Sequence, residues 1–230
     1  MEKPKKSKHR KLFYWLLVDA AVAVGVFSLL LHRPSQYHPV LSTVPPDPNG
    51  ERVPRYISHE LAPKLYNGAQ SRRPFEMVVL DKNLNEALAQ QTWLQEAGVA
   101  LSAPAVLFVS GHIVLMGTAD VKGANFVVTV KLGPQLDEKG CLNLAVEKVK
   151  VGAMNVTPLA RMMGRKMYKE RLDTGPVDTD DIRTKIAASL LSGKPFDPVF
   201  LVDDKWVRLQ SFQITPGKLI AQLVPAKPRK

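Results

Sequence analysis

Residues 104–118 read PAVLFVSGHIVLMGT, residues 123–134 read GANFVVTVKLGP, and residues 141–153 read CLNLAVEKVKVGA. Each stretch is rich in β-branched and other apolar residues, and Gly, Asp and Pro separate one stretch from the next. This pattern predicts three long β segments in an antiparallel meander. In the first segment, residues 110–112 (Ser-Gly-His) interrupt the apolar run, which predicts a bulge or a sharp bend.

Both faces of the first β segment are apolar. Its alternating residues form two sets, Leu107, Val109, Ile113 and Leu115 on one side and Val106, Phe108, Val114 and Met116 on the other. A sheet that is apolar on both faces must cover both, and a helix can cover one of them. The other face then needs a second layer, a partner protein or a ligand.

The segments around the meander predict the helices and strands of an α+β protein. Residues 75–80 form a strand, and Asp81 caps a helix that places Leu84 and Leu88 on one face and Asn85 on the opposite, polar face. Further elements are expected as helices at 54–69, 157–172 and 181–191, and as strands at 199–202, 205–215 and 218–224. These elements form a curved antiparallel sheet wrapped on helices.

Residues 12–31 read LFYWLLVDAAVAVGVFSLLL. Twenty residues of helix span about 30 Å, the thickness of the hydrocarbon core of a bilayer. Six Lys and Arg side chains precede this run and only Arg33 follows it closely, so the N-terminus is expected in the cytoplasm. The run is longer than that of a signal peptide, and no small-residue cleavage site follows it. We therefore expect an uncleaved, single-pass anchor in a bacterial inner (cytoplasmic) membrane.

The anchor divides the chain into five parts. These are a basic cytoplasmic tail at 1–11, the transmembrane helix at 12–31, a proline-rich linker at 32–52, an extracytoplasmic α+β domain at 53–225 and a tail at 226–230. The prolines of the linker predict a semi-extended segment that lifts the domain off the membrane. Cys141 is the only cysteine, so an intramolecular disulfide is excluded.

Within the apolar run, Asp19 is a carboxylate at membrane depth, which is costly and marks a candidate functional residue. Ala21 and Gly25 have the small-xxx-small spacing that allows a second helix to approach closely. Asp19, Ala21 and Gly25 are therefore candidates for contact with a partner membrane protein.

No sequence motif for catalysis or metal binding is present. The five histidines form no i,i+4 pair, and the chain lacks an HExxH motif, a Cys/His cluster, a GxSxG motif and a phosphate-binding loop. The acidic group at 178–181 is interpreted as a helix cap. We expect no catalytic residue, no metal and no cofactor, and hence no enzyme. The net charge is +11, yet no aromatic-basic platform or reading motif predicts nucleic acid as a partner.

The helix expected at 157–172 carries two lines of side chains. Met163 and Met167 follow one line, and Arg161, Arg165 and Lys169 follow the other. Three interpretations stay open: a helix that lies on a membrane surface, a core helix with a solvated basic face, and a helix whose methionines line an apolar cavity. The three basic residues are candidates for contact with a membrane surface.

Several of these features resemble the YpmS-type family of bacterial membrane-anchored proteins and, more loosely, the tubular lipid-binding (TULIP-like) superfamily. They are the strand and helix at 75–91 with the pair Leu84–Asn85, the long bent strands at 104–132, the segment 141–153 with Val149–Gly152, the following helix, and a closing hairpin at 206–223. The resemblance covers residues 74–225. It implies a curved antiparallel sheet around a long helix, with a lipid or acyl chain in an apolar groove.

The favoured function is therefore binding or carrying of lipid by a membrane-anchored, non-enzymatic domain. The candidate groove residues are Leu107, Val109, Ile113, Leu115, Met163 and Met167. The sequence does not decide which sheet face is groove and which is core. The alternative is a structural or scaffold subunit of a cell-envelope assembly, which binds another protein through its apolar sheet face.

Overall fold

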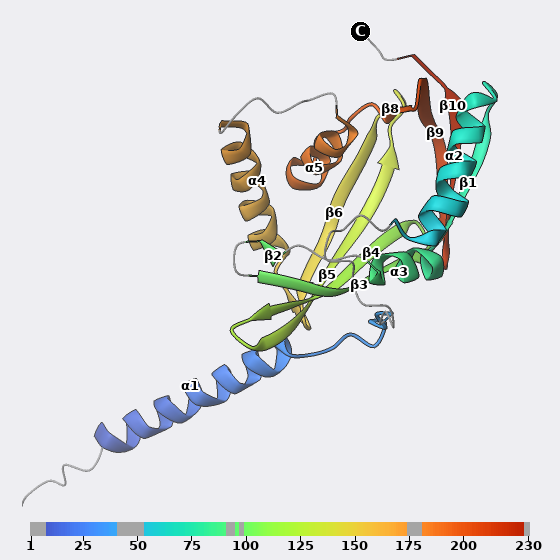
Figure 1. Cartoon of the computed structure of the whole chain (residues 1–230). Helices are drawn as coiled ribbons and strands as arrows, with labels where there is room; N and C mark the ends of the chain where they lie inside the picture. Colours follow the sequence, from blue (N-terminus) through green and yellow to red (C-terminus); the bar gives the residue numbers. More distant parts are fainter. Residues whose placement is uncertain (1–7, 41–52, 91–94, 97–98, 174–180, 228–230) are drawn as a thin grey trace, which may run out of the picture.

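The computed structural model describes residues 8–40, 53–90, 95–96, 99–173 and 181–227. In these residues the chain is an α+β protein with two antiparallel sheets and five α-helices (Figure 1). The helices are α1 (Lys8–Leu30), α2 (Ala62–Gln70), α3 (Asp81–Ala89), α4 (Thr157–Asp173) and α5 (Ile182–Ser192), with a π-helical turn, η1 (Tyr56–Leu61), directly before α2. The helices expected from the sequence at 54–69, 157–172 and 181–191 are confirmed.

The larger sheet has six strands in the order β2-β3-β4-β5-β6-β7, and all neighbours are antiparallel. Its strands are β2 (Gln95–Glu96), β3 (Val99–Val109), β4 (His112–Val121), β5 (Ala124–Leu136), β6 (Leu142–Val151) and β7 (Met154–Asn155). The antiparallel meander predicted from the sequence is confirmed, because β3 to β6 follow one another in both sequence and space.

The segment 104–118 is two strands, not one bent strand. Ser110 and Gly111 form a tight turn, so that Phe108 pairs with Ile113 and Leu107 with Val114. Residues that face each other across an antiparallel pair share a face of the sheet. The expectation that Leu107 lies on the same face as Ile113 is therefore wrong, because the turn reverses the chain and changes the alternation.

The two faces of this sheet are named here by what covers them. The α3 face carries Val106, Phe108, Ile113, Leu115, Gly117, Val128 and Val130, and α3 packs on it. The linker face carries Leu107, Val109, Val114, Met116 and Val127, and the segment after α1 packs on it. Each apolar face thus has at least one covering element within this chain.

The smaller sheet has the order β1-β10-β9-β8, with β1 (Phe75–Leu80), β8 (Val199–Val202), β9 (Lys205–Thr215) and β10 (Lys218–Pro225). Ile214 of this sheet packs on Val106 and Phe108 of the α3 face in one buried cluster. Backbone hydrogen bonds also join the sheets, from Gly217 N to Phe108 O at 3.0 Å and from Gly111 N to Ile214 O at 3.0 Å. The β3–β4 turn is therefore fixed against the smaller sheet.

The segment that follows α1 packs on the sheet. Tyr37 is buried against Ala105 and Val127, and its hydroxyl donates to Ala103 O at 2.6 Å and is hydrogen-bonded to Thr118 Oγ1 at 2.8 Å. Residues 32–40 of the predicted linker thus pack on the domain through Tyr37, and the prediction that the linker lifts the domain off the membrane stays a prediction. The rest of the predicted linker, residues 41–52, lies outside the described residues.

The C-terminal end of α1 contacts the turn between β6 and β7 (Figure 1). Ala153 N donates to Leu29 O at 2.8 Å, which gives a partner to one of the last carbonyl groups of the helix. Gly152 in this turn has φ +57°, and a Cβ at this position would collide with the carbonyl oxygens of Leu29 and Leu30. A glycine is therefore required where the helix meets the sheet.

Candidate functional site

An apolar groove lies on the α3 face, between α3 and strands β3 to β5. Its volume is about 450 Å³, within the usual range of ligand pockets. The groove is lined by Leu84, Leu88, Ser102, Pro104, Ala105, Val106, Leu115, Met116, Gly117, Val128 and Val130. Ser102 is the one polar residue in this set, so the groove can hold an apolar group and offers almost nothing to a charged one.

Asn85 holds α3 against the edge of β3. Its Nδ2 donates to Val106 O at 2.8 Å, and its Oδ1 accepts from Val106 N at 2.6 Å. One turn earlier, Asp81 Oδ2 accepts from Phe108 N at 3.3 Å. These side chains satisfy backbone groups of an edge strand, which a neighbouring strand would otherwise satisfy. They also fix Leu84 above the sheet, where it forms one wall of the groove.

Two expectations for α3 are therefore corrected. Asn85 is buried and not on a solvated polar face, because its amide pairs with the backbone of Val106. Asp81 does not cap the helix, since its carboxylate accepts from Phe108 and the N-cap residue is Leu80, without a side-chain cap. The helix pattern alone does not show the partners of these side chains, which lie 21 residues (Val106) and 27 residues (Phe108) further along the chain.

The residues predicted for the groove are dispersed. Leu115 lines the groove, and Ile113 packs beside it in the cluster around Phe108 and Ile214. Leu107 and Val109 lie on the linker face, in the cluster of Tyr37. Met163 and Met167 are on α4, are 53% and 59% exposed, and do not line this groove.

The groove also contains residues that were not singled out from the sequence as groove candidates. Leu84 and Leu88 were assigned to the apolar face of their helix, but that pattern does not say what the face covers. Val128 and Val130 lie in β5 opposite Gly117 and Leu115. The alternation of side chains along β5 predicts that Val128 and Val130 share a face of the sheet. The pairing of β5 with β4 shows that this is the α3 face.

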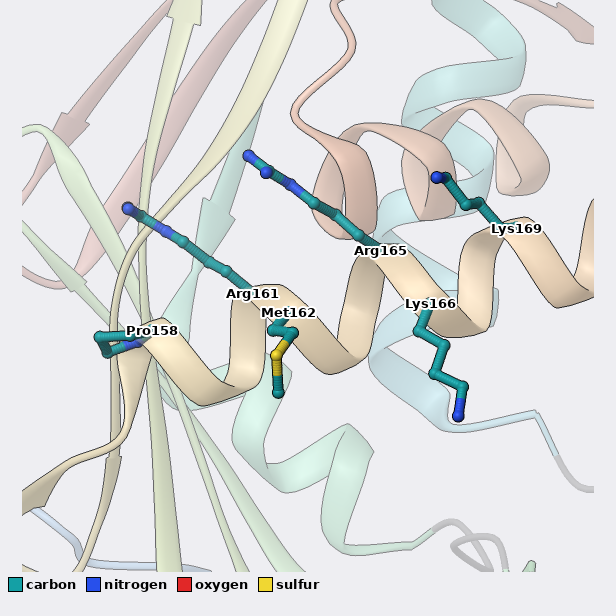
Figure 2. A pocket seen from close by; sticks show the side chains of 6 residues that line it. All are labelled: Pro158, Arg161, Met162, Arg165, Lys166 and Lys169. Carbon is teal, nitrogen blue, oxygen red and sulfur yellow. The ribbon is translucent and has the colours of Figure 1, made fainter.

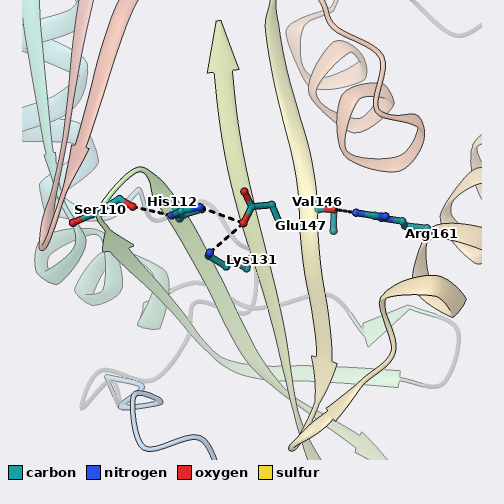
Figure 3. Close-up of polar contacts among 6 residues, drawn as sticks. All are labelled: Ser110, His112, Lys131, Val146, Glu147 and Arg161. Atoms are coloured by element: carbon teal, nitrogen blue, oxygen red, sulfur yellow. Dashed lines mark hydrogen bonds and ion pairs between the residues drawn. The ribbon is translucent and has the colours of Figure 1, made fainter.

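α4 lies along the other edge of the sheet, beside β6. Thr157 Oγ1 accepts from Val149 N at 2.8 Å, and an Nη atom of Arg161 donates to Val146 O at 2.8 Å (Figure 3). From α5, Ser189 Oγ accepts from Leu144 N at 2.9 Å. Side chains of the two helices thus give partners to the backbone of this edge strand. Arg161, predicted as a residue for contact with a membrane surface, is partly engaged in this way.

The outer side of α4 forms a shallow basic hollow (Figure 2). Its volume is about 460 Å³, and it is lined by Pro158, Arg161, Met162, Arg165, Lys166 and Lys169. Figure 2 shows Arg161, Arg165 and Lys169 extending to one side of the helix and Met162 and Lys166 to the other. The three basic residues predicted for membrane contact therefore share one side of this helix.

A polar cluster lies on the linker face. Glu147 Oε2 is 3.1 Å from Lys131 Nζ and 3.2 Å from His112 Nε2, and His112 Nδ1 is 2.7 Å from Ser110 O (Figure 3). The hydrogen bond from Lys131 is the main cause that holds the pKa of Glu147 below its ordinary value of 4.5. The side chains are about one third exposed, so these surface ion pairs contribute little to the free energy of unfolding.

Among the described residues, no group of three or more His, Cys, Asp or Glu side chains could hold a metal ion. Of the acidic group at 178–181, Asp181 caps α5 by accepting from Arg183 N at 3.2 Å, and the others lie outside the described residues. The expectation of no metal and no cofactor stays a prediction.

The fold defines an α+β protein with two antiparallel sheets and, in the described part of the chain, one N-terminal helix long and apolar enough to cross a membrane, over Phe13–Leu30. Comparison with protein-family models, with curated proteins and with solved structures finds no match to the chain. The resemblance to the YpmS-type family and the tubular lipid-binding superfamily therefore stays a prediction.

Proposed function

We propose that this protein is a single-pass protein of a bacterial cytoplasmic membrane, whose extracytoplasmic domain binds an acyl chain of a lipid in the groove under α3. The observation that carries this proposal is the lining of the groove, in which Ser102 is the one polar residue. An acyl chain is a ligand that such a surface can bind without leaving a polar group unpaired. In this proposal the protein is a binding or carrier protein and not an enzyme.

The anchor is supported by α1 itself. Its residues from Phe13 to Leu29 are exposed, and the window Phe13–Leu30 has a mean hydropathy of 2.0. A helix that is apolar on all sides and uncovered by protein is typical of a membrane span. The basic residues before it favour an N-terminus in the cytoplasm, which places the two sheets outside.

The energetics limit what the groove can do by itself. A methylene group that leaves water for an apolar site contributes about 0.8 kcal/mol, whereas one that leaves a bilayer contributes almost nothing. A lipid taken from the membrane must therefore be retained by shape and by contacts of its polar head. This proposal extends the resemblance to the tubular lipid-binding superfamily, whose members hold lipid in an apolar groove.

Native mass spectrometry of the full-length protein, purified in a mild detergent, tests the proposal. We expect a bound mass of a fatty acid or phospholipid that is lost on denaturation. Leu115→Glu places a carboxylate in the groove and should abolish retention, while Leu201→Glu, the same change at a residue that is 52% exposed, should not. Val128→Trp fills the groove without adding charge and should also reduce retention.

Equal lipid retention by the wild type and by both groove variants would contradict the proposal, because the lipid would then be bound elsewhere, for example around α1. A wild-type protein free of lipid would favour the alternative function, a scaffold subunit of an envelope assembly. Crosslinking in native membranes would then identify its partner, with Asp19, Ala21 and Gly25 as the candidate contacts within α1.

A further inference from the structure

α4 packs on the rest of the protein by a narrow stripe of residues. Gly164 is buried, and a Cβ there would lie 3.4 Å from the Leu191 side chain of α5. Ala160 and Tyr168, one turn before and after Gly164, are half-buried. The stripe has the helical spacing of four residues, and the residues on the opposite side of the helix are exposed in the part of the chain that the structure describes.

The uncovered side of α4 is apolar as well as basic. Its large apolar side chains are Leu159, Met162, Met163 and Met167, and they are 52% to 64% exposed. Its basic side chains are Arg165, Lys166 and Lys169, and Arg161 lies in line with them and donates to Val146 O. The acidic residues of α4 are Glu170 and Asp173, and Glu170 is paired with Lys166 at 3.8 Å. Four large exposed apolar side chains on one helix are unusual for a surface that faces only water.

Most of these side chains form two separate lines, and Met162 and Lys166 lie between the lines. Leu159, Met163 and Met167 follow one another at intervals of four residues on one flank, and Arg161, Arg165 and Lys169 do so on the other. This is the pattern of a helix that lies in the interface of a bilayer, with its apolar flank among acyl chains and its basic flank at the phosphates. Arg and Lys can bury their aliphatic stems while the charged ends reach the headgroups.

The position of α4 is fixed relative to the end of α1. Ala153 binds Leu29 through a backbone hydrogen bond, and α4 begins at Thr157, which is itself bound to Val149 of β6. The first turn of α4 therefore lies close to the point where α1 ends. The first turns of α4 lie directly beside β6, and Figure 1 shows the later turns on the outer side of the molecule, beside α5.

We infer that α4 binds the surface of the anionic bilayer in which α1 is anchored, through its apolar flank and its line of basic side chains. This inference rests on the proposed membrane anchoring and is independent of the groove. An anionic bilayer is the partner whose charge complements α4, because lipid phosphates pair with its basic side chains. α1 brings α4 close to that bilayer, because the end of α1 is bonded to the turn just before α4. Bound in this way, α4 and α1 orient the domain on the membrane at two points.

Site-directed spin labelling of the full-length protein tests this inference. The native thiol is removed by Cys141→Ser, and a nitroxide is attached through Met163→Cys or, as a probe on α2, through Tyr66→Cys. The protein is placed in vesicles of phosphatidylcholine, with or without phosphatidylglycerol. Collisions of the label with oxygen report contact with lipid, and collisions with a nickel chelate report contact with water.

We expect the label at residue 163 to lose its contact with the nickel chelate in vesicles that contain phosphatidylglycerol, while the label at residue 66 keeps it. Arg165→Glu with Lys169→Glu should restore the contact at residue 163. Lys64→Glu with Arg73→Glu is the matched control with the same change in charge at exposed residues near α2, and it should have no effect.

A label at residue 163 that stays in contact with water in phosphatidylglycerol vesicles would overturn the inference. So would a label that is shielded from both oxygen and nickel whatever the lipid charge, because that result indicates contact with a protein. Failure of anchoring is recognised separately, since the protein would then not float with vesicles of either composition.

Discussion

Asn85 of α3 and Val106 of β3 are joined by two hydrogen bonds, from Asn85 Nδ2 to Val106 O at 2.8 Å and from Val106 N to Asn85 Oδ1 at 2.6 Å. Both residues are buried. One side-chain amide thus takes the place of a neighbouring strand at the edge of the sheet, and it fixes the helix that covers the groove. Edge protection and groove geometry depend on the same pair of residues.

Asn85→Ala should lower the free energy of unfolding by about 2–4 kcal/mol, because it leaves both backbone groups of Val106 buried without a partner. Unfolding of the full-length protein in urea, in a mild detergent, measures this change. Asn83→Ala is the matched control, the same substitution on the same helix at a half-buried residue. An equal effect of the two substitutions would show that the bonds to Val106 contribute little.

The contact between α1 and the β6–β7 turn predicts a difference between two glycines. Gly152 and Gly123 both have positive φ, at +57° and +85°, but only Gly152 lies against the end of α1. Gly123→Ala should lower stability by the backbone strain alone, about 1–2 kcal/mol. Gly152→Ala should lower it further and should also displace the end of α1.

Hydrogen–deuterium exchange of the backbone amides at residues 31–33, just after α1, measures that displacement in the full-length protein in detergent. We expect faster exchange there in Gly152→Ala than in the wild type and an unchanged rate in Gly123→Ala. Equal exchange in all three proteins would mean that the turn does not hold the helix end.

The meander was predictable because it depends on local features. The strands β3 to β6 follow from runs of apolar residues separated by glycine, aspartate and proline, which act over a few residues. The faces were not predictable in the same way. The turn at Ser110–Gly111 decides whether Leu107 shares a sheet face with Ile113 or with Val114. The same sequence is compatible with a bulge and with a two-residue turn.

The contacts that form the groove could not be predicted from the sequence, for a different reason. Asn85 pairs with a backbone that is 21 residues away, and no local pattern marks an asparagine as the partner of a strand edge. α4 was predicted correctly as a helix with separate methionine and basic lines. Its sequence left open whether Met163 faces the core, and only the packing of Gly164 on α5 shows which side is buried.

Glu147 predicts a weak dependence of stability on pH. The pKa of its carboxyl is lowered in the folded protein, mainly by the hydrogen bond from Lys131. The contribution of Glu147 to the free energy of unfolding is therefore fully present above the unfolded-state pKa of 4.5. This contribution is lost as the pH falls from 4.5 through the lower pKa of the folded state. Because the pair is exposed, we expect Glu147→Gln to cost less than about 1 kcal/mol at pH 7.

Unfolding of wild type and Glu147→Gln at a series of pH values tests this. The difference between them should vanish at acidic pH and should shrink in high salt, which screens exposed pairs. Glu138→Gln, at an exposed residue, removes the same charge and is the matched control. A difference that persists after Glu147 is protonated would indicate a packing effect and not an ion pair.

The contacts of Tyr37 predict that its hydroxyl and its ring both hold the segment after α1 on the larger sheet. Tyr37→Phe keeps the ring among Ala105, Val114 and Met116 but removes the bonds to Ala103 O and Thr118 Oγ1. Because these groups then lose a partner in a buried site, the free energy of unfolding should fall by about 1–2 kcal/mol. Tyr66→Phe, at a tyrosine that is 47% exposed, should change it little. The informative measurement is hydrogen–deuterium exchange of the backbone amides at residues 31–40 under native conditions. Faster exchange in Tyr37→Phe alone would mean that the hydroxyl fixes the segment to the sheet, whereas unchanged exchange would assign that role to the apolar contacts of the ring.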